Sequence, residues 1–267
     1  MKNVLDFMAW GISHASSARI PAGSTLCVPL EQVGSAGVWQ YLYGTTGAKC
    51  TQALLDKKYG QYYKAWGWSR KEFDSVTAGW AAQGVTVCDC QGLEDKYSGA
   101  DTNAKGNYAN YCTDKGRIAY INRPYVYGEA IFVGSATSSI DHVGWIAGFA
   151  ADGEPLVLHE RGLAHGCVIE RMSSAGKKWS YRGLMKKRYS YEAITVPPLT
   201  PVTPPETAPD PKQTVLRITK PLMRGGAIKD LQDALNAMGY DCGTADGICG
   251  EKTRAGILAF IERHKDM

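Results

Sequence analysis

The chain has 267 residues, of which 44% are apolar and 21% charged, and its 30 basic and 26 acidic side chains leave a formal net charge of +4. A composition this apolar and this balanced excludes a disordered chain, and no apolar run approaches the roughly 20 residues that span a bilayer. A net charge this small does not indicate the strong basic stripe that is typical of nucleic-acid-binding proteins. We therefore expect neither a nucleic-acid partner nor membrane insertion.

The N-terminal residues predict an amphipathic helix over residues 3–12 rather than a signal peptide. One lysine precedes the apolar stretch, but Asp6 interrupts it and the basic region is thin. We therefore expect synthesis in the cytoplasm, where thiols stay reduced. Any action outside the cell would then need another exit route.

Helix-like patterns occupy the first part of the chain, and short β-rich runs follow them. The helical patterns lie at residues 50–59, 69–80, 90–97 and 106–115. The β-rich runs lie at residues 117–121, 129–133, 143–149, 156–159, 167–170 and 181–189. Helices followed by strands predict an α+β domain with an antiparallel sheet, not an alternating α/β fold.

A proline-rich segment divides the chain. Residues 195–213 hold seven of the 12 prolines, which favour extended polyproline II and exclude a helix or a central strand. We interpret this segment as a semi-rigid linker between a unit at residues 1–194 and a small unit at residues 214–267. A proline-rich surface loop within one domain is the alternative.

The C-terminal unit predicts a small all-α module. Four apolar residues recur at helical spacing before Gly239, and three more mark a second helix: Ile228, Leu231, Leu235, Met238, then Ile257, Phe260 and Ile261. A turn-rich loop, residues 241–250, lies between them. A module of about 54 residues has little room for a buried active site, which favours a binding role.

A basic segment lies near the end of the first unit. Residues 171–188 hold seven basic side chains and no acidic one: Arg171, Lys177, Lys178, Arg182, Lys186, Lys187 and Arg188. This pattern indicates either a solvated strand face or a contact with an anionic polymer such as a cell-wall surface.

Cys90 is the candidate nucleophile. It lies in Cys88-Asp-Cys-Gln-Gly-Leu-Glu-Asp-Lys-Tyr97, where Asp89 is placed to cap a helix and Cys90 would occupy its first turn. Backbone N–H groups at a helix start favour a thiolate. Such catalysis also needs an imidazole to take the proton and a third group to orient it.

His142 and His159 are the candidate imidazoles. If Asp152-Gly153 forms a two-residue hairpin loop, His159 lies opposite Ile146, and His142 is on the same face of the sheet. The two histidines would then be roughly 13 Å apart at the usual strand rise. A bulge near Gly148 or a longer loop would have to shorten that distance.

Five short motifs resemble the NlpC-type papain-fold cysteine peptidases, which are bacterial and phage peptidoglycan hydrolases. In chain order they are Tyr41-Leu-Tyr-Gly-Thr-Thr-Gly47, Asp89-Cys-Gln-Gly-Leu93, Gly128-Glu-Ala-Ile-Phe132, His142-Val-Gly144 and His159. The family pattern is Tyr-x-Tyr/Trp-Gly-Gly, Asp-Cys-Ser-Gly-Leu, Gly-Asp-Leu-x-Phe and His-Val-Gly. The resemblance covers about residues 36–170.

The resemblance implies a papain-like catalytic domain that uses no metal or other cofactor. Cys90 would be the nucleophile, His142 the general base and acid, and His159 the orienting residue, while Tyr41 would position substrate or stabilise the oxyanion. We expect Asp89, Gln91 and Trp145, which adjoin these motifs, to contact substrate.

Two features depart from the family pattern. Gln91 stands where serine is usual, and residues 45–84 form an insertion rich in tyrosine, tryptophan and lysine. Its aromatic residues could wall a substrate groove or pack as a helical subdomain of their own; they are Tyr59, Tyr62, Tyr63, Trp66 and Trp68.

The C-terminal unit resembles the three-helix peptidoglycan-binding module. The matching segments are residues 228–240, Asp246-Gly-Ile-Cys-Gly-Glu-Lys-Thr253 and the helix through Phe260. Cys249 stands where phenylalanine is usual, and Ile261 where glutamine is usual. We interpret Asp246 and Gly247 as turn residues rather than ligand contacts.

Together these features predict a monomeric peptidoglycan hydrolase of the endolysin type, acting on the cell wall after release. γ-D-Glutamyl-diamino-acid endopeptidase is the favoured activity, and N-acetylmuramoyl-L-alanine amidase is the alternative. A non-catalytic wall-binding protein, an acyltransferase and a zinc site are further alternatives. Zinc is disfavoured because Cys88-x-Cys90 lacks the usual two-to-four-residue gap.

The eight cysteines have different expected roles. Cys90 would carry the chemistry, and Cys88 would be a buried neighbour. The others in the first unit are expected to be reduced core thiols: Cys27, Cys50, Cys112 and Cys167. Cys242 and Cys249 flank the loop of the small module and could form a disulfide outside the cell.

Overall fold

The computed structural model describes residues 1–174, 177–191, 224 and 226–264. The chain divides into two compact units, Met1–Val202 and Thr203–Met267. The predicted linker at residues 195–213 lies outside the described residues. Within the described ranges, no helix combines the length and apolar character needed to cross a bilayer.

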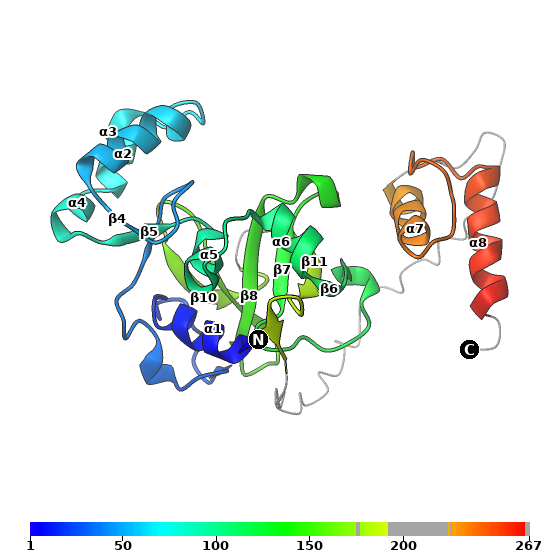
Figure 1. The fold of residues 1–267 in the computed structure, drawn as a ribbon, viewed down its shortest axis with the longest axis horizontal. Helices are drawn as coiled ribbons and strands as arrows, with labels where there is room; N and C mark the ends of the chain where they lie inside the picture. Colours follow the sequence, from blue (N-terminus) through cyan, green and yellow to red (C-terminus); the bar gives the residue numbers. More distant parts are fainter. Residues whose placement is uncertain (175–176, 192–223, 225, 265–267) are drawn as a thin grey trace. The chain divides into compact units, whose positions relative to one another are not determined.

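An antiparallel sheet forms the centre of the first unit (Figure 1). Its strands follow the order β10-β9-β8-β7-β11-β6, and every neighbouring pair is antiparallel. Their bounds are Thr113–Arg117 for β6, Ala130–Val133 for β7, His142–Phe149 for β8, Pro155–Glu160 for β9, Cys167–Arg171 for β10 and Trp179–Leu184 for β11. A short strand, β2 (Thr25–Leu26), pairs with the end of β8.

Three helices contribute to the core around this sheet. They are α1 (Val4–Ile12), α5 (Gly92–Ser98) and α6 (Ala104–Tyr111). The helix predicted at residues 3–12 is confirmed, because Asn3 caps α1 and its apolar face is buried. Phe7 of α1 packs edge-to-face on Trp145 of β8, with ring centroids 5.1 Å apart. This packing fixes α1 against the central strand of the sheet.

The insertion at residues 45–84 forms a lobe with a core of its own (Figure 1). It contains α2 (Gln52–Lys58), a π-helical turn (Tyr59–Tyr63), α3 (Arg70–Val76) and α4 (Trp80–Gln83). A small sheet of β3 (Gln40–Tyr41), β5 (Thr86–Cys88) and β4 (Ala48–Lys49) joins the lobe to the nucleophile segment. Tyr63 and Phe73 are buried, whereas Trp66 is 53% exposed. The lobe therefore packs as a helical subdomain but leaves one aromatic face open.

Two strand predictions need correction. Residues 118–120 form a 3-10 turn (Ile118–Tyr120) after β6, not the centre of a strand. The predicted strand at residues 181–189 is broken after Leu184, and β12 (Tyr189–Ser190) pairs in parallel with β1 (Lys2–Asn3). Among the described residues, further 3-10 turns lie at Leu30–Gln32 and Thr137–Ser139. The expected combination of helices with an antiparallel sheet is confirmed.

The described part of the second unit contains two helices, α7 (Gly226–Ala237) and α8 (Glu251–His264). Tyr240 packs on Phe260 with ring centroids 5.6 Å apart. Gln232 of α7 donates hydrogen bonds to Thr253 at 2.8 Å and to Asp246 at 3.1 Å. This helical unit agrees with the predicted all-α module, and a third helix would have to lie outside the described residues.

Candidate active site

Cys90 lies in the turn between β5 and α5. The helix begins at Gly92, two residues later than the sequence pattern predicted. Asp89 caps this start as expected, because its carboxylate accepts the Gly92 N–H at 2.7 Å. The other carboxylate oxygen accepts the Gly44 N–H at 3.0 Å. Asp89 therefore fixes the nucleophile turn and ties it to the segment that follows Tyr41.

The Cys90 sulfur faces the backbone on both sides of His142. It lies 3.9 Å from the Asp141 carbonyl oxygen, and the Val143 N–H points to it. Cys90 is only 6% exposed. Burial, together with the charge of Asp89, raises the pKa of the Cys90 thiol to about 12. The thiol is therefore protonated at neutral pH in the ligand-free chain.

The two histidines meet across β8 and β9. Two irregularities shift the register by one residue each. The turn is longer than two residues, because Ala150 N–H donates to the Glu154 carbonyl, and a bulge lies between Ile146 and Gly148, so Ile146 lies opposite Val157 rather than His159. Both are irregularities that the sequence suggested as ways to shorten the distance. Together they bring Nε2 of His142 to 3.0 Å from Nδ1 of His159. A Cβ on Gly144 would lie 3.1 Å from the Cβ of His159, so glycine leaves space for this ring.

Glu170 of β10 completes the chain of hydrogen bonds. Its carboxylate lies 3.0 Å from Nε2 of His159, which must carry the proton because an ionised carboxylate only accepts. Nδ1 of neutral His159 is then an acceptor, so Nε2 of His142 donates to it. This assignment leaves Nδ1 of His142 unprotonated and able to act as the base.

Two arginines keep Glu170 ionised. Arg161 Nε lies 3.1 Å away and Arg19 Nη1 3.2 Å away. Burial alone would raise the pKa of Glu170, but the His159 hydrogen bond and the arginine charges outweigh it and hold the pKa below its usual value. For His142, burial and then the neighbouring His159 hold the pKa well below its usual value. His142 is therefore neutral, as a general base must be.

Glu170 was not predicted from the sequence. Its available signal is a single carboxylate that follows the apolar run Cys167–Ile169 in a buried strand. Val168 pairs with His159, and Glu170 lies two residues further on the same face. Trp179 of β11 covers both histidines, with ring centroids 5.5 Å away.

Tyr41 lies beside the nucleophile turn, because β3 pairs with β5 and aligns Tyr41 with Cys88. Burial, the largest cause, raises the pKa of the Tyr41 hydroxyl, and a thiolate at Cys90 would raise it further. The hydroxyl therefore stays protonated and can donate to developing negative charge.

The structure corrects the expectation that Gln91 and Trp145 contact substrate. Gln91 is 3% exposed, and its amide donates to Glu94 and Asp95 at 2.9 Å each. Trp145 is fully buried against Phe7. Both side chains support the core beneath the site instead of facing a ligand.

We predict that Glu170→Gln lowers turnover by about tenfold to hundredfold, the usual range for a residue that orients a functional group. The glutamine oxygen can still accept the His159 proton, but the negative charge is lost. Glu170 raises the pKa of His159, so without that charge the hydrogen-bonded imidazole pair holds a proton less well, and the acid limb of the pH–rate profile moves to lower pH.

The matched control is Asp152→Asn, which removes an exposed carboxylate paired with Arg171. Its pH profile should coincide with that of the unmodified chain. A Glu170→Gln profile that also coincides would show that Glu170 does not act on the histidines.

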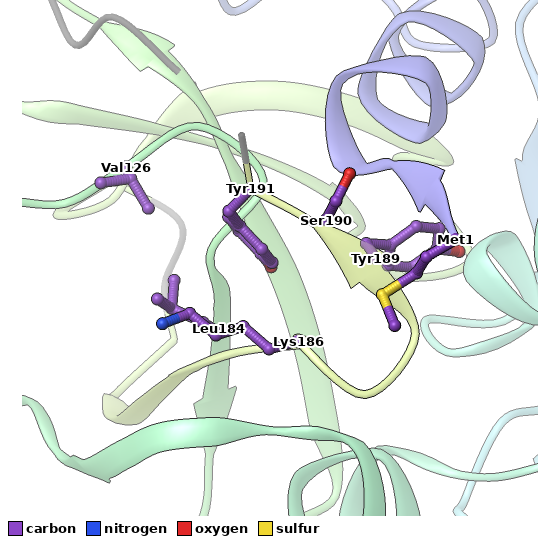
Figure 2. Close-up of a pocket in the computed structure, with 7 residues that line it drawn as sticks. All are labelled: Met1, Val126, Leu184, Lys186, Tyr189, Ser190 and Tyr191. Atoms are coloured by element: carbon purple, nitrogen blue, oxygen red, sulfur yellow. The ribbon is translucent and has the colours of Figure 1, made fainter. Parts of the chain in front are cut away.

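Metal ligation is not apparent at this site. Across the described ranges, no group of three or more histidine, cysteine or acidic side chains is placed to hold a metal ion. An open cavity of about 570 Å³ lies elsewhere in the first unit, and its lining shares no residue with the histidine pair. Figure 2 shows the residues that line it. The lining residues are Met1, Val126, Leu184, Lys186, Tyr189, Ser190 and Tyr191.

The basic segment is not a free cationic face. Arg182 is buried against Glu129, and Arg188 pairs with Glu94. Arg171 pairs with Glu154 at 2.6 Å, and Lys186 with Asp114 at 2.6 Å. Four of its seven cations are therefore neutralised within the first unit.

Comparison with known families identifies the second unit. Residues 224–265 match the family described as "Putative peptidoglycan binding domain". This part of the chain is a peptidoglycan-binding domain. Comparison with curated proteins and with solved structures finds no match to the chain.

The peptidoglycan-binding domain uses Asp246 and Gly247 as turn residues. Asp246 accepts the Ile248 N–H at 2.9 Å, and Gly247 has a positive φ of 74°. Cys242 and Cys249 are buried free thiols here, and the disulfide that they could form outside the cell stays a prediction. The cysteines of the first unit are also free thiols; all are buried except Cys27, which is half-buried. Association with the cell wall is the function that this domain supports.

Proposed function

We propose that the chain is a peptidoglycan hydrolase. Its first unit, which we assign to the papain-like cysteine peptidases, cuts an amide bond in the peptide stem, and its second unit holds the enzyme on the wall. Tethering raises the local concentration of scissile bonds without adding catalytic contacts. We further propose that it acts after release from the cell in which it is made.

One observation carries this proposal: Cys90 faces the backbone of His142, and His142 is oriented through His159 by Glu170. A thiol, a neutral imidazole and an orienting group are the parts that nucleophilic cysteine catalysis needs. Their presence in one chain with a peptidoglycan-binding domain supports peptidoglycan as the substrate class.

The raised thiol pKa and the lowered imidazole pKa determine the first step. Cys90 and His142 are both neutral at rest, so Nδ1 of His142 takes the thiol proton as the sulfur attacks the carbonyl carbon. His142 then returns this proton to the leaving amine. The resulting thioester is hydrolysed by water, which His142 activates in the same way.

The oxyanion of the tetrahedral intermediate needs donors that are already in place. We assign this role to backbone N–H groups of the nucleophile turn and to the Tyr41 hydroxyl. Asp89 fixes the turn through Gly92, so these donors do not have to reorganise during the reaction.

Cys90→Ser tests the proposal. The variant should release no new amino groups from purified sacculi, yet it should sediment with them, because the peptidoglycan-binding domain is unchanged. Cys27→Ser, which alters a half-buried thiol, is the matched control and should remain active. Lysis that survives in Cys90→Ser would overturn the nucleophile assignment.

The bond is proposed on resemblance, with γ-D-glutamyl-diamino-acid cleavage favoured over cleavage at the muramic acid–L-alanine link. Mass spectrometry of the digested muropeptides separates the two, because only the amidase frees whole stem peptides from the sugar. Appearance of a transferred acyl product would instead indicate an acyltransferase.

A further inference from the structure

An aromatic cluster on the insertion lobe remains open to solvent. Tyr43, Tyr62 and Trp66, here called the aromatic platform, contact one another, with ring centroids 4.8 to 5.7 Å apart. Trp66 is 53% exposed and Tyr43 36% exposed. Exposed aromatic groups of this kind mark interaction sites more often than single exposed apolar residues do.

The platform is anchored rather than loose. Tyr63 is buried beneath it, packs on Trp66 at 5.4 Å and binds the Tyr43 N–H through its hydroxyl at 3.0 Å. Lys58 is also buried, and it donates to the Gly44 carbonyl and lies over the Tyr62 ring. Rigid rings bind a ligand at a low cost in conformational entropy.

The platform is continuous with the candidate active site. Tyr43 and Gly44 lie next to each other, and Gly44 donates to the Asp89 carboxylate beside Cys90. The Asp89 N–H in turn donates to the Thr45 carbonyl at 2.9 Å. Beyond Trp66, a cavity of about 760 Å³ extends the surface towards α3. A polymer held at Cys90 can therefore run onto the platform.

We propose that Tyr43, Tyr62 and Trp66 form a saccharide subsite that stacks a pyranose ring of the glycan strand beside the stem peptide being cut. The inference rests on the proposed function. The flat face of a pyranose presents weakly positive C–H groups, which match the negative faces of aromatic rings. Stem peptides of alanine, glutamate and a diamino acid offer no such face.

The test compares two soluble substrates that carry the same stem peptide, one attached to the disaccharide and one without sugar. Trp66→Ala should raise KM about tenfold for the sugar-bearing substrate, the scale expected when an aromatic anchor is removed. It should change kcat/KM for the sugar-free peptide less than twofold. Trp66→Phe should restore most of the loss, since a ring remains.

Tyr120→Ala removes an aromatic side chain of similar exposure elsewhere, and it should leave KM unchanged for both substrates. Equal losses on both substrates would show that the platform binds peptide or supports the fold, and no loss on either would show that it binds nothing. Both results overturn the subsite.

Binding separates failure of the subsite from failure of the proposed function. All seven tryptophans lie within residues 1–191, so their fluorescence reports on the first unit alone. Titration of the disaccharide into Cys90→Ser should change this fluorescence, and the change should vanish in Cys90→Ser with Trp66→Ala. If the unmodified chain cleaves neither substrate but the two Cys90→Ser variants differ in this fluorescence change, the subsite stands and the proposed hydrolase activity is wrong. If the two variants show no difference, the subsite is overturned.

Discussion

Glu129→Gln is expected to destabilise the first unit by about 3–5 kcal/mol, the cost of leaving a buried charge without its partner. Glu129 is fully buried directly before β7, and Arg182 of β11 is 2% exposed. The two side chains form paired hydrogen bonds of 2.6 Å, and Arg123 donates two more to the same carboxylate.

Glutamine cannot replace this carboxylate. One of its two terminal groups is a donor, which would face the arginine N–H groups and leave the guanidinium charge uncompensated. Arg182 still donates to two backbone carbonyls, those of Arg123 and Pro124. The loss of stability in Glu129→Gln therefore comes more from the unpaired charge than from missing hydrogen bonds.

Denaturant unfolding followed by tryptophan fluorescence measures this loss, because every tryptophan lies in the first unit. Lys186→Gln is the matched control: it breaks an ion pair with Asp114 in which both side chains are about half exposed. Exposed pairs contribute roughly 0–1 kcal/mol. If Glu129→Gln costs no more than this control, the buried pair does not stabilise the unit as argued.

The histidine pair shows which part of the site strand periodicity can predict. Alternation alone places His142 and His159 on one face of adjacent strands. Their 3.0 Å contact depends on the bulge before Gly148 and on a turn longer than two residues, and alternation can place neither. The contact of Glu170 with His159 was harder to predict, because it depends on how β10 pairs with β9, and this pairing is a tertiary property.

Weak local patterns explain the fold elements that were mispredicted. β6 is a polar strand at the end of the sheet, and its side chains are half-exposed or exposed, so no apolar alternation marks it. The apolar run at Ile118–Tyr120 carried the strand-like signal instead, although the backbone there forms a 3-10 turn. Strands of two residues, such as β3 and β4, are too short to show any period.

Glu160→Gln is expected to remove a pH dependence of stability worth about 5 kcal/mol. Glu160 is fully buried on β9, where the Cys88 thiol donates to it at 3.0 Å and Cys167 lies opposite. Burial raises the pKa of Glu160 from 4.5 to about 8, against the opposing effect of the thiol hydrogen bonds. A shift of about 3.5 units at about 1.4 kcal/mol each gives this estimate.

The sign follows from which state holds the proton. Between pH 4.5 and about 8 the folded chain keeps Glu160 protonated, whereas the unfolded chain has lost that proton. The favourable contribution is therefore complete below pH 4.5 and is lost as the pH rises through about 8. Glutamine is neutral throughout, so the stability of the unmodified chain should fall relative to Glu160→Gln across this range.

Unfolding measured from pH 4 to 8.5 for both chains isolates this group, because the other titrating residues are common to them. Glu154→Gln provides a control of opposite sign. Burial alone would raise the pKa of Glu154, but hydrogen bonds from Ser173 and Arg171 outweigh it and lower the pKa. The unmodified chain should therefore gain stability relative to this variant as the pH rises towards 4.5, and the difference should stay level above that pH. If the difference in unfolding free energy between the unmodified chain and Glu160→Gln stays constant from pH 4.5 to 8, Glu160 is ionised in the folded chain. Its charge would then lie next to the histidine that orients the proposed catalytic base.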